Sequence, residues 1–211
     1  MPNYLMHGPQ FAKNYVSSYL QNDLPKRVIR YRNGWNISSA ELPMPEKFFS
    51  HEPLALDVWP TVITVVISTS RFDRLGFEGH DPMYRVIYAM RTYVWCRAVG
   101  ADEATIARDR LTAVIRSALL DYPCLKALDP RESFQARIEE NSMREEFSEI
   151  TLLKGDRVLC GGYVGYELGI NEVVSRQDIG QIDEIELTVS QDGLTDTNLD
   201  VSSNSQTVTI E

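Results

Sequence analysis

Apolar and polar side chains alternate most clearly between residues 84 and 99, in the run YRVIYAMRTYVWCRAV. Successive side chains of a strand point to opposite faces of a sheet. One face of this run is almost wholly apolar and consists of Tyr84, Val86, Tyr88, Met90, Thr92, Val94, Cys96 and Ala98. The many β-branched and aromatic residues favour a strand over a helix. We therefore predict one long strand with a face turned toward the core.

The opposite face of this strand is amphipathic. It carries Arg85, Ile87, Ala89, Arg91, Tyr93, Trp95, Arg97 and Val99. Tryptophan, tyrosine and arginine are enriched at protein interfaces. Two interpretations follow: a helix from the N-terminal part of the chain covers this face, or another subunit does.

A helix is predicted directly after Gly100. Apolar residues recur at spacings of three and four, which is typical of an amphipathic helix. They are Ala104, Ala107, Leu111, Val114 and Ala118. We expect Asp102 to cap the helix, Glu103 to lie in its first turn and Pro123 to stop it.

The N-terminal part predicts a helix over residues 8–22, with Pro9 at a favourable first position. The pattern of residues 28–31 then predicts a short strand that ends in a tight turn at Asn33 and Gly34. Three arginines accompany this strand: Arg27, Arg30 and Arg32. Such a cluster is more typical of a solvated face or of ion pairs than of a nucleic-acid site.

The middle of the chain predicts a loop, a buried strand and a second loop. Residues 37–57 are rich in proline, and long loops of this kind often meet a partner. Residues 58–70 are apolar on both faces, which fits the centre of a helix-covered sheet. Residues 71–83 contain two glycines and a proline and are predicted to be a loop. The candidate partner contacts in the two loops are Phe48, Phe49, Arg71, Arg74 and His80.

Further strands are predicted near the end of the body. One begins at about residue 134, and another covers residues 157–174 after a turn at residues 154–156. Gly161, Gly162 and Gly165 in the last strand indicate a bend or a close approach of another group to the backbone. The predicted fold class is therefore α+β, sandwich-like: a mixed, mainly antiparallel sheet packed with two helices, plus an extended C-terminal β-prone segment.

Charge divides the chain into a body and an acidic extension. The net charge is −9, and residues 177–211 hold eight acidic side chains and no Lys or Arg, which leaves −1 for residues 1–176. We predict one domain over residues 1–176 and a C-terminal extension over residues 177–211. The extension is either a disordered acidic tail or a tether that adds a strand to a neighbouring molecule. Its candidate strand-forming residues are Ile185, Leu187, Val189, Val208 and Ile210.

No motif for catalysis, cofactor binding or metal binding is recognised in the sequence. The glycines do not form a phosphate-binding loop, and the three histidines and three cysteines lack metal-ligand spacing. His80 beside Asp81 is more typical of an exposed polar loop than of a catalytic pair. No apolar run reaches the length of a membrane span, and no secretory signal precedes the body. The prediction is a protein of the reducing cytoplasm that is not an enzyme, with no cofactor, no metal and no membrane.

The order of these elements resembles that of the tail terminator and tail-completion proteins of bacteriophages with long, non-contractile tails. The resemblance covers residues 10–175 and rests on a helix ending near YLQNDLP, the strand PTVITVVIS, the strand YRVIYAMRTYVWCRA and the helix DEATIARDRLTAVIRSALL. The C-terminal extension and the long loops depart from the family pattern, and no short diagnostic motif is present.

The resemblance implies a virion structural protein that caps the tail tube, halts its growth and docks the tail to the head. Such proteins form a ring, usually a hexamer, at the head–tail joint, after assembly in the host cytoplasm. The implied partners are further copies of the chain, the major tail tube protein and the head–tail connector or stopper protein, while DNA passes through the lumen without specific binding. The candidate subunit-interface residues are Arg85, Arg91, Tyr93, Trp95 and Arg97. The alternatives are a head-completion or connector subunit of the same neck, and a soluble cytoplasmic enzyme with a dispersed site.

Overall fold

A computed structural model gives the structure of the chain. It describes residues 8–53, 56–78, 81–121, 124–126, 135–148, 152–154 and 156–174. The chain divides into two units, residues 1–176 and 177–211, and every described residue belongs to the first. The β-prone residues of the C-terminal extension, Ile185 to Ile210, lie outside the described residues, as does His80.

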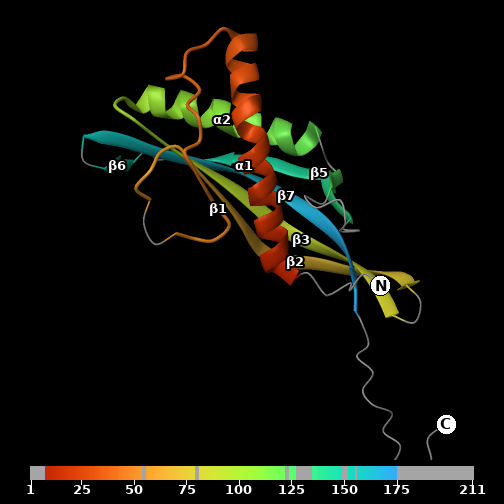
Figure 1. The fold of residues 1–211 in the computed structure, drawn as a ribbon. Helices are drawn as coiled ribbons and strands as arrows, with labels where there is room; N and C mark the ends of the chain where they lie inside the picture. Colours follow the sequence, from red (N-terminus) through yellow and green to blue (C-terminus); the bar gives the residue numbers. More distant parts are fainter. Residues whose placement is uncertain are drawn as a thin grey trace, which may run out of the picture. The chain divides into compact units, whose positions relative to one another are not determined.

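The first unit is an α+β fold, as predicted from the sequence (Figure 1). Its elements are α1 (Gly8–Trp35), β1 (Lys47–Phe49), β2 (Thr61–Glu78), β3 (Asp81–Ala98), α2 (Ala101–Asp121), β4 (Cys124–Lys126), β5 (Gln135–Phe147), β6 (Leu152–Lys154) and β7 (Arg157–Val173). The sheet has the strand order β1-β2-β3-β7-β5-β4, and β6 pairs with β7. All neighbouring strands are antiparallel except β1 and β2, which are parallel.

Both helices pack against one face of the sheet. The predicted core face of β3 is confirmed: Val86, Met90 and Val94 are at most 3% exposed and belong to one apolar cluster. Leu111 of α2 and Leu20 of α1 are fully buried in the same cluster. The small side chains of α2 toward the sheet let the helix approach closely. The sheet therefore has one face covered by helices, which we call the helix face, and an opposite face, which we call the open face.

Helix α1 is much longer than the sequence predicts, and the prediction of a strand and turn before residue 35 is wrong. Leu20, Leu24 and Val28 follow one another at spacings of four and are fully buried, so the apolar stripe of a helix continues past residue 22. Pro25 lies within the helix. Packing of this stripe against the sheet and α2 outweighs the local preference of Val28 and its neighbours for a strand.

The prediction of a loop over residues 71–83 is also wrong. Strand β2 continues to Glu78, and β3 begins at Asp81, so the two strands form a long hairpin whose pairing runs from Thr61 opposite Trp95 to Glu78 opposite Asp81. Three register shifts interrupt the pairing, and Gly76 at the last of them has a φ of 144°. Glycine adopts this backbone conformation readily, so the sequence features that suggest a loop mark irregularities within a strand.

Strand β2 is not central, contrary to the prediction. Strands β3 and β7 occupy the middle of the sheet, and the only described strand outside β2 is the three-residue β1. Thr61 to Val65 are buried, but Ile67 is 48% exposed. The apolar character of both faces of β2 therefore reflects burial at one end of the strand only.

Two smaller differences concern element ends. Helix α2 begins at Ala101, directly after Gly100 as predicted, but Gly100 rather than Asp102 is its cap, and the Glu103 carboxylate accepts the Gly100 N–H at 3.5 Å. The predicted loop over residues 37–57 contains strand β1. The predicted late strands are present as β5 and β7, and β5 carries a register shift between Glu139 and Arg144.

Candidate subunit interface

The open face of the sheet carries all five predicted interface residues of β3: Arg85, Arg91, Tyr93, Trp95 and Arg97. Cross-strand partners share a face, so β5 and β7 add Glu139, Arg144, Glu146, Tyr163 and Glu167 to it. Helix α1 lies on the other face, so the interpretation that an N-terminal helix covers these residues is wrong. Within the described part of the chain, no helix lies on the open face (Figure 1).

A cluster of one arginine and two tyrosines lies at the middle of the open face. The Arg91 guanidinium lies 4.5 Å from the centre of the Tyr163 ring and donates a hydrogen bond to the Tyr93 hydroxyl at 3.3 Å. The rings of Tyr93 and Tyr163 are 5.2 Å apart. A hydrogen bond to the Glu146 carboxylate, followed by partial burial, raises the pKa of Tyr163, and the bond to Tyr93 raises the pKa of Arg91. Cation–π contact and hydrogen bonding thus fix a half-buried aromatic surface.

Glycines of β7 give the long side chains of this face room to lie flat. A Cβ atom on Gly161 would come within 2.9 Å of the Trp95 ring, and one on Gly169 would come within 2.6 Å of the Arg85 guanidinium. The contact at Gly161 is the close approach predicted for this glycine, whereas Gly169 was not among the predicted positions. The open face is therefore a low platform of aromatic and arginine side chains.

Ion pairs link the ends of the platform to β5 and to the turn before β7. Arg85 pairs with Glu139 of β5, and Arg97 lies 3.9 Å from Asp156. Arg97 and Asp156 also line an open polar hollow together with Trp59 and Arg157. The structure therefore brings Arg91 and Tyr93 together, while Trp95, Arg85 and Arg97 lie at separate positions along β3.

A second exposed apolar surface was missed by the sequence prediction. The hairpin end of β2 carries Ile67, Phe72, Leu75 and Phe77, which are 45–64% exposed. We call residues 64–78 of β2 the arm. Figure 1 shows this end of β2 and β3, in yellow, beyond the first turn of α1. The sequence pattern of a strand was present, because Phe72 alternates with charged residues, but the glycines and proline nearby suggested a loop.

The predicted loop contacts separate into two groups in the structure. Arg71 and Arg74 lie on the arm, where Arg71 pairs with Asp73 at 2.8 Å and Arg74 lies 4.7 Å from the centre of the Phe77 ring. Phe48 and Phe49 lie in β1 and are half-buried, and Phe48 packs against the core. Because β1 pairs with the opposite end of β2, these residues do not form one site with the arginines.

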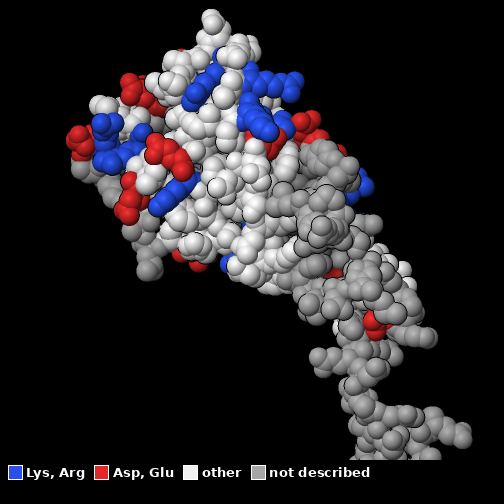
Figure 2. All heavy atoms as spheres, in the orientation of Figure 1, with Lys and Arg blue, Asp and Glu red and all other residues white. Residues whose placement is uncertain are grey.

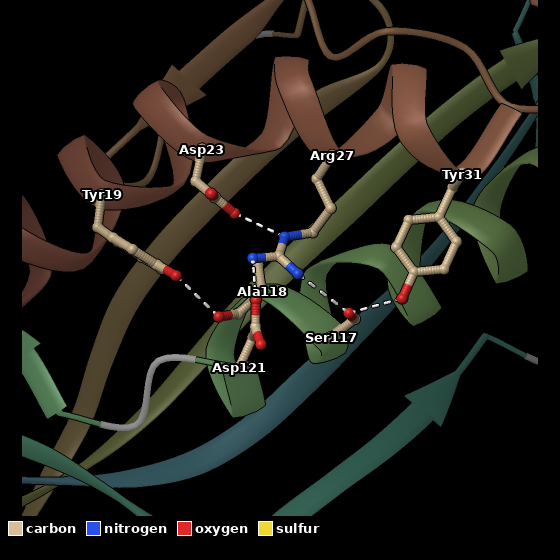
Figure 3. A network of polar contacts seen from close by, with 7 residues as sticks. All are labelled: Tyr19, Asp23, Arg27, Tyr31, Ser117, Ala118 and Asp121. Carbon is tan, nitrogen blue, oxygen red and sulfur yellow. Dashed lines mark hydrogen bonds and ion pairs between the residues drawn. The ribbon is translucent and has the colours of Figure 1, made fainter. Parts of the chain in front are cut away.

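The basic cluster of α1 has a structural role. Arg27 donates to Asp23 at 2.6 Å and to Ser117 and Asp121 of α2 at 3.3 and 2.9 Å (Figure 3). The Tyr19 hydroxyl donates to the Ala118 carbonyl oxygen at 2.8 Å, and burial is the main cause that raises its pKa to about 12. The network fastens α1 to α2, in agreement with the prediction of ion pairs for this cluster.

Charge on the visible surface is mixed in sign. Figure 2 shows Lys and Arg interspersed with Asp and Glu on the side where α1 lies in front. No broad basic area is visible there. This view agrees with a near-neutral body and offers no surface of the kind that binds the phosphate backbone.

Comparisons with known proteins do not place the chain in a family. No protein-family model matches it, and no curated protein matches its sequence. Among the described residues, no group of three or more His, Cys, Asp or Glu side chains is arranged to hold a metal ion. No helix in that part of the chain is long and apolar enough to cross a membrane.

Proposed function

We propose that the chain is a virion structural protein that forms a ring at the head–tail joint of a long-tailed bacteriophage and terminates the tail tube. The observation that carries the proposal is the open sheet face, with Arg91, Tyr93, Tyr163 and Trp95 at its surface and both helices on the other side. Such a face is suited to burial against another protein, since these residue types dominate interface energetics. The resemblance of the predicted element order to that of tail terminators supports the same role, although α1 continues to Trp35 instead of ending near YLQNDLP.

A ring requires two different surfaces on each subunit. A heterologous interface joins one patch to a different patch of the next copy, and it closes when the rotation between copies is right. The open face and the arm are two such surfaces, because the arm extends from one edge of the sheet. In this proposal the ring is a hexamer whose neighbours are the tail tube protein and the head connector or stopper protein.

DNA passes through the lumen of the proposed ring without being gripped. A strongly basic lumen would bind the phosphate backbone through counterion release. The net charge of −1 over residues 1–176 and the acidic extension are compatible with passage instead. The proposal includes no catalytic step and no cofactor.

Deletion of the gene for this chain from the proposed phage tests the proposal. A terminator stops polymerisation of the tube. Without it, we expect tails of uncontrolled length that are not joined to heads. Electron microscopy of the infected cells measures the tail lengths. Supplying the wild-type chain from a plasmid is the control and restores tails of one length. Tails of normal length in the deletion strain would contradict the proposal.

A further inference from the structure

The arm of β2 has an unpaired edge. Strand β1 pairs with β2 only at Thr61, Val62 and Ile63, and no described strand pairs with residues 64–78 on the side away from β3. An unpaired edge presents backbone N–H and C=O groups to any extended chain that approaches it. The exposed apolar side chains of the arm make this edge favourable for an added strand.

Register shifts divide the arm into short regular runs. They lie between Val66 and Ser68, between Thr69 and Arg71, and between Arg74 and Gly76. Residues 71–74 are the longest uninterrupted run of the arm, and each pairs with one residue of β3. An added strand that matches this run must be short, on the order of four to five residues.

The two faces of this run differ in chemistry. Phe72 is opposite Val86 and shares the helix face of the sheet, but it is 64% exposed because it lies past the end of the helix layer. Arg74, opposite Tyr84, shares the helix face with Phe72, while Arg71 and Asp73 lie on the open face and pair with each other at 2.8 Å. Among the described side chains of β2, the charged ones are Arg71, Asp73 and Arg74, with one net positive charge.

The sequence of the C-terminal extension contains a segment of matching length and pattern. Ile185, Leu187 and Val189 alternate with Glu184, Glu186 and Thr188. In a strand, the three apolar side chains would lie on one face and the acids on the other. In a strand paired with residues 71–74, the apolar side lies on the face of Phe72 and Arg74, and the acidic side lies on the face of Arg71 and Asp73.

We propose that residues 71–74 of the arm bind residues 185–189 of a second copy of this chain as an added strand. The inference rests on the proposed function in one respect, namely that copies of the chain lie side by side. Val174 donates its N–H to the carbonyl oxygen of Pro82 at 3.0 Å, so the described chain ends on β7, with β3 between it and the arm. The following ten or so residues span up to about 35 Å when extended, which is several times the spacing between neighbouring strands.

Four full-length variants test this docking. Leu187→Pro removes a backbone donor from the added strand, and Leu199→Pro places the same change outside it. Phe72→Glu sets a charge on the arm against the apolar side of the added strand, and Ile29→Glu is its control, because Ile29 is 52% exposed on α1. Sedimentation equilibrium is expected to show self-association weakened at least about tenfold by Leu187→Pro and by Phe72→Glu, and unchanged by the controls.

Mixing the two disabled chains decides which copy supplies the strand. The Leu187→Pro chain keeps an intact arm, and the Phe72→Glu chain keeps an intact strand, so the mixture is expected to form pairs that neither chain forms alone. No pairing in the mixture would overturn the proposal. Slow amide exchange of residues 71–74 in an isolated monomer, lost in Leu187→Pro, would also overturn it by assigning the strand to the same copy.

The outcomes separate this inference from the proposed function. Closed rings that persist in the Leu187→Pro variant would refute strand docking and leave the ring intact. The opposite result is also distinguishable. If the two variants form mixed pairs but the wild-type chain never closes into a ring, strand docking is supported and the proposed role as a tail terminator is contradicted.

Discussion

Glycines of β7 shape the open face at the level of single residues. The β-carbon of an alanine at position 161 would lie 2.9 Å from the Trp95 ring, which is closer than carbon atoms approach without displacement. The ring is stiff and lies against the strand, so it must move as a unit. The platform thus depends on the absence of a side chain at this position as much as on the aromatic residue itself.

We expect Gly161→Ala to destabilise the chain by about 1–3 kcal/mol, because overpacking forces Trp95 from its site. The free energy of unfolding in urea, followed by tryptophan fluorescence, measures the effect. Gly34→Ala is the matched control: nothing lies within 4 Å of its β-carbon position, and alanine favours a helix, so this variant should be neutral or more stable. Equal stability of Gly161→Ala and wild type would show that Trp95 is free to move.

Substitution of Arg91 should affect assembly much more than folding. Its guanidinium contacts Tyr163 and Tyr93 at the surface of the open face, so Arg91→Glu should weaken self-association strongly while changing the free energy of unfolding by less than about 1 kcal/mol. Mass photometry and urea unfolding measure the two quantities. Lys26→Glu reverses an exposed charge on α1 and should alter neither. If Arg91→Glu self-associates with the affinity of the wild type, Arg91 has no role in assembly and is an ordinary solvated residue.

Polar contacts between elements hold α1 and the loop after it in place. Arg27 bridges α1 to α2, and its side chain is only 11% exposed. We expect Arg27→Met to destabilise the chain by roughly 1–3 kcal/mol, since Asp23 and Asp121 lose their shared partner. Thermal unfolding measures the change. Arg30→Met, on the exposed side of the same helix, should stay within about 0.5 kcal/mol of wild type, and an equal loss in both variants would contradict a specific role for the network.

The loop after α1 is fixed by Glu41. Hydrogen bonds from Ser38, together with Arg110 of α2 at 2.9 Å, lower the pKa of Glu41 to about 2. A carboxyl group whose pKa is depressed by folding stabilises the fold above its unfolded pKa, and this contribution is lost as pH falls from about 4.5 toward 2. Urea midpoints between pH 5 and pH 2 should therefore fall less steeply for Glu41→Gln than for wild type, with Glu52→Gln as the control. Parallel pH profiles for wild type and Glu41→Gln would contradict this assignment.

Sequence periodicity predicted β3 and α2 closely, because each shows one clear period over its whole length. It failed for the second half of α1, where three buried side chains at helical spacing compete with β-branched and aromatic residues. It failed again for the arm, where glycines that mark bulges resemble those that mark loops. Local sequence does not distinguish these cases, since packing against distant elements decides them.

The open face was predictable in part. The alternation of β3 placed Arg91 and Tyr93 on one side, but their partners Tyr163 and Glu146 come from strands far along the chain. Pairing register between such strands depends on the whole sheet, and a single sequence does not reveal it. The exposed apolar surface of the arm was missed for a different reason, because the glycines and proline near it favoured a loop over a strand.

At the scale of the whole molecule, we propose that the chain is a subunit of a closed ring. Within the described residues, no helix covers the open face and no strand pairs with the free edge of the arm, and such surfaces are costly to leave exposed on a monomer. In the proposed ring, neighbouring copies cover both. The mass of the full-length protein in solution tests this claim most directly. Sedimentation velocity from low to high micromolar concentration should show one closed oligomer, near 144 kDa for six copies of the 24.0 kDa chain. A stable species of 24.0 kDa at every concentration would contradict the claim.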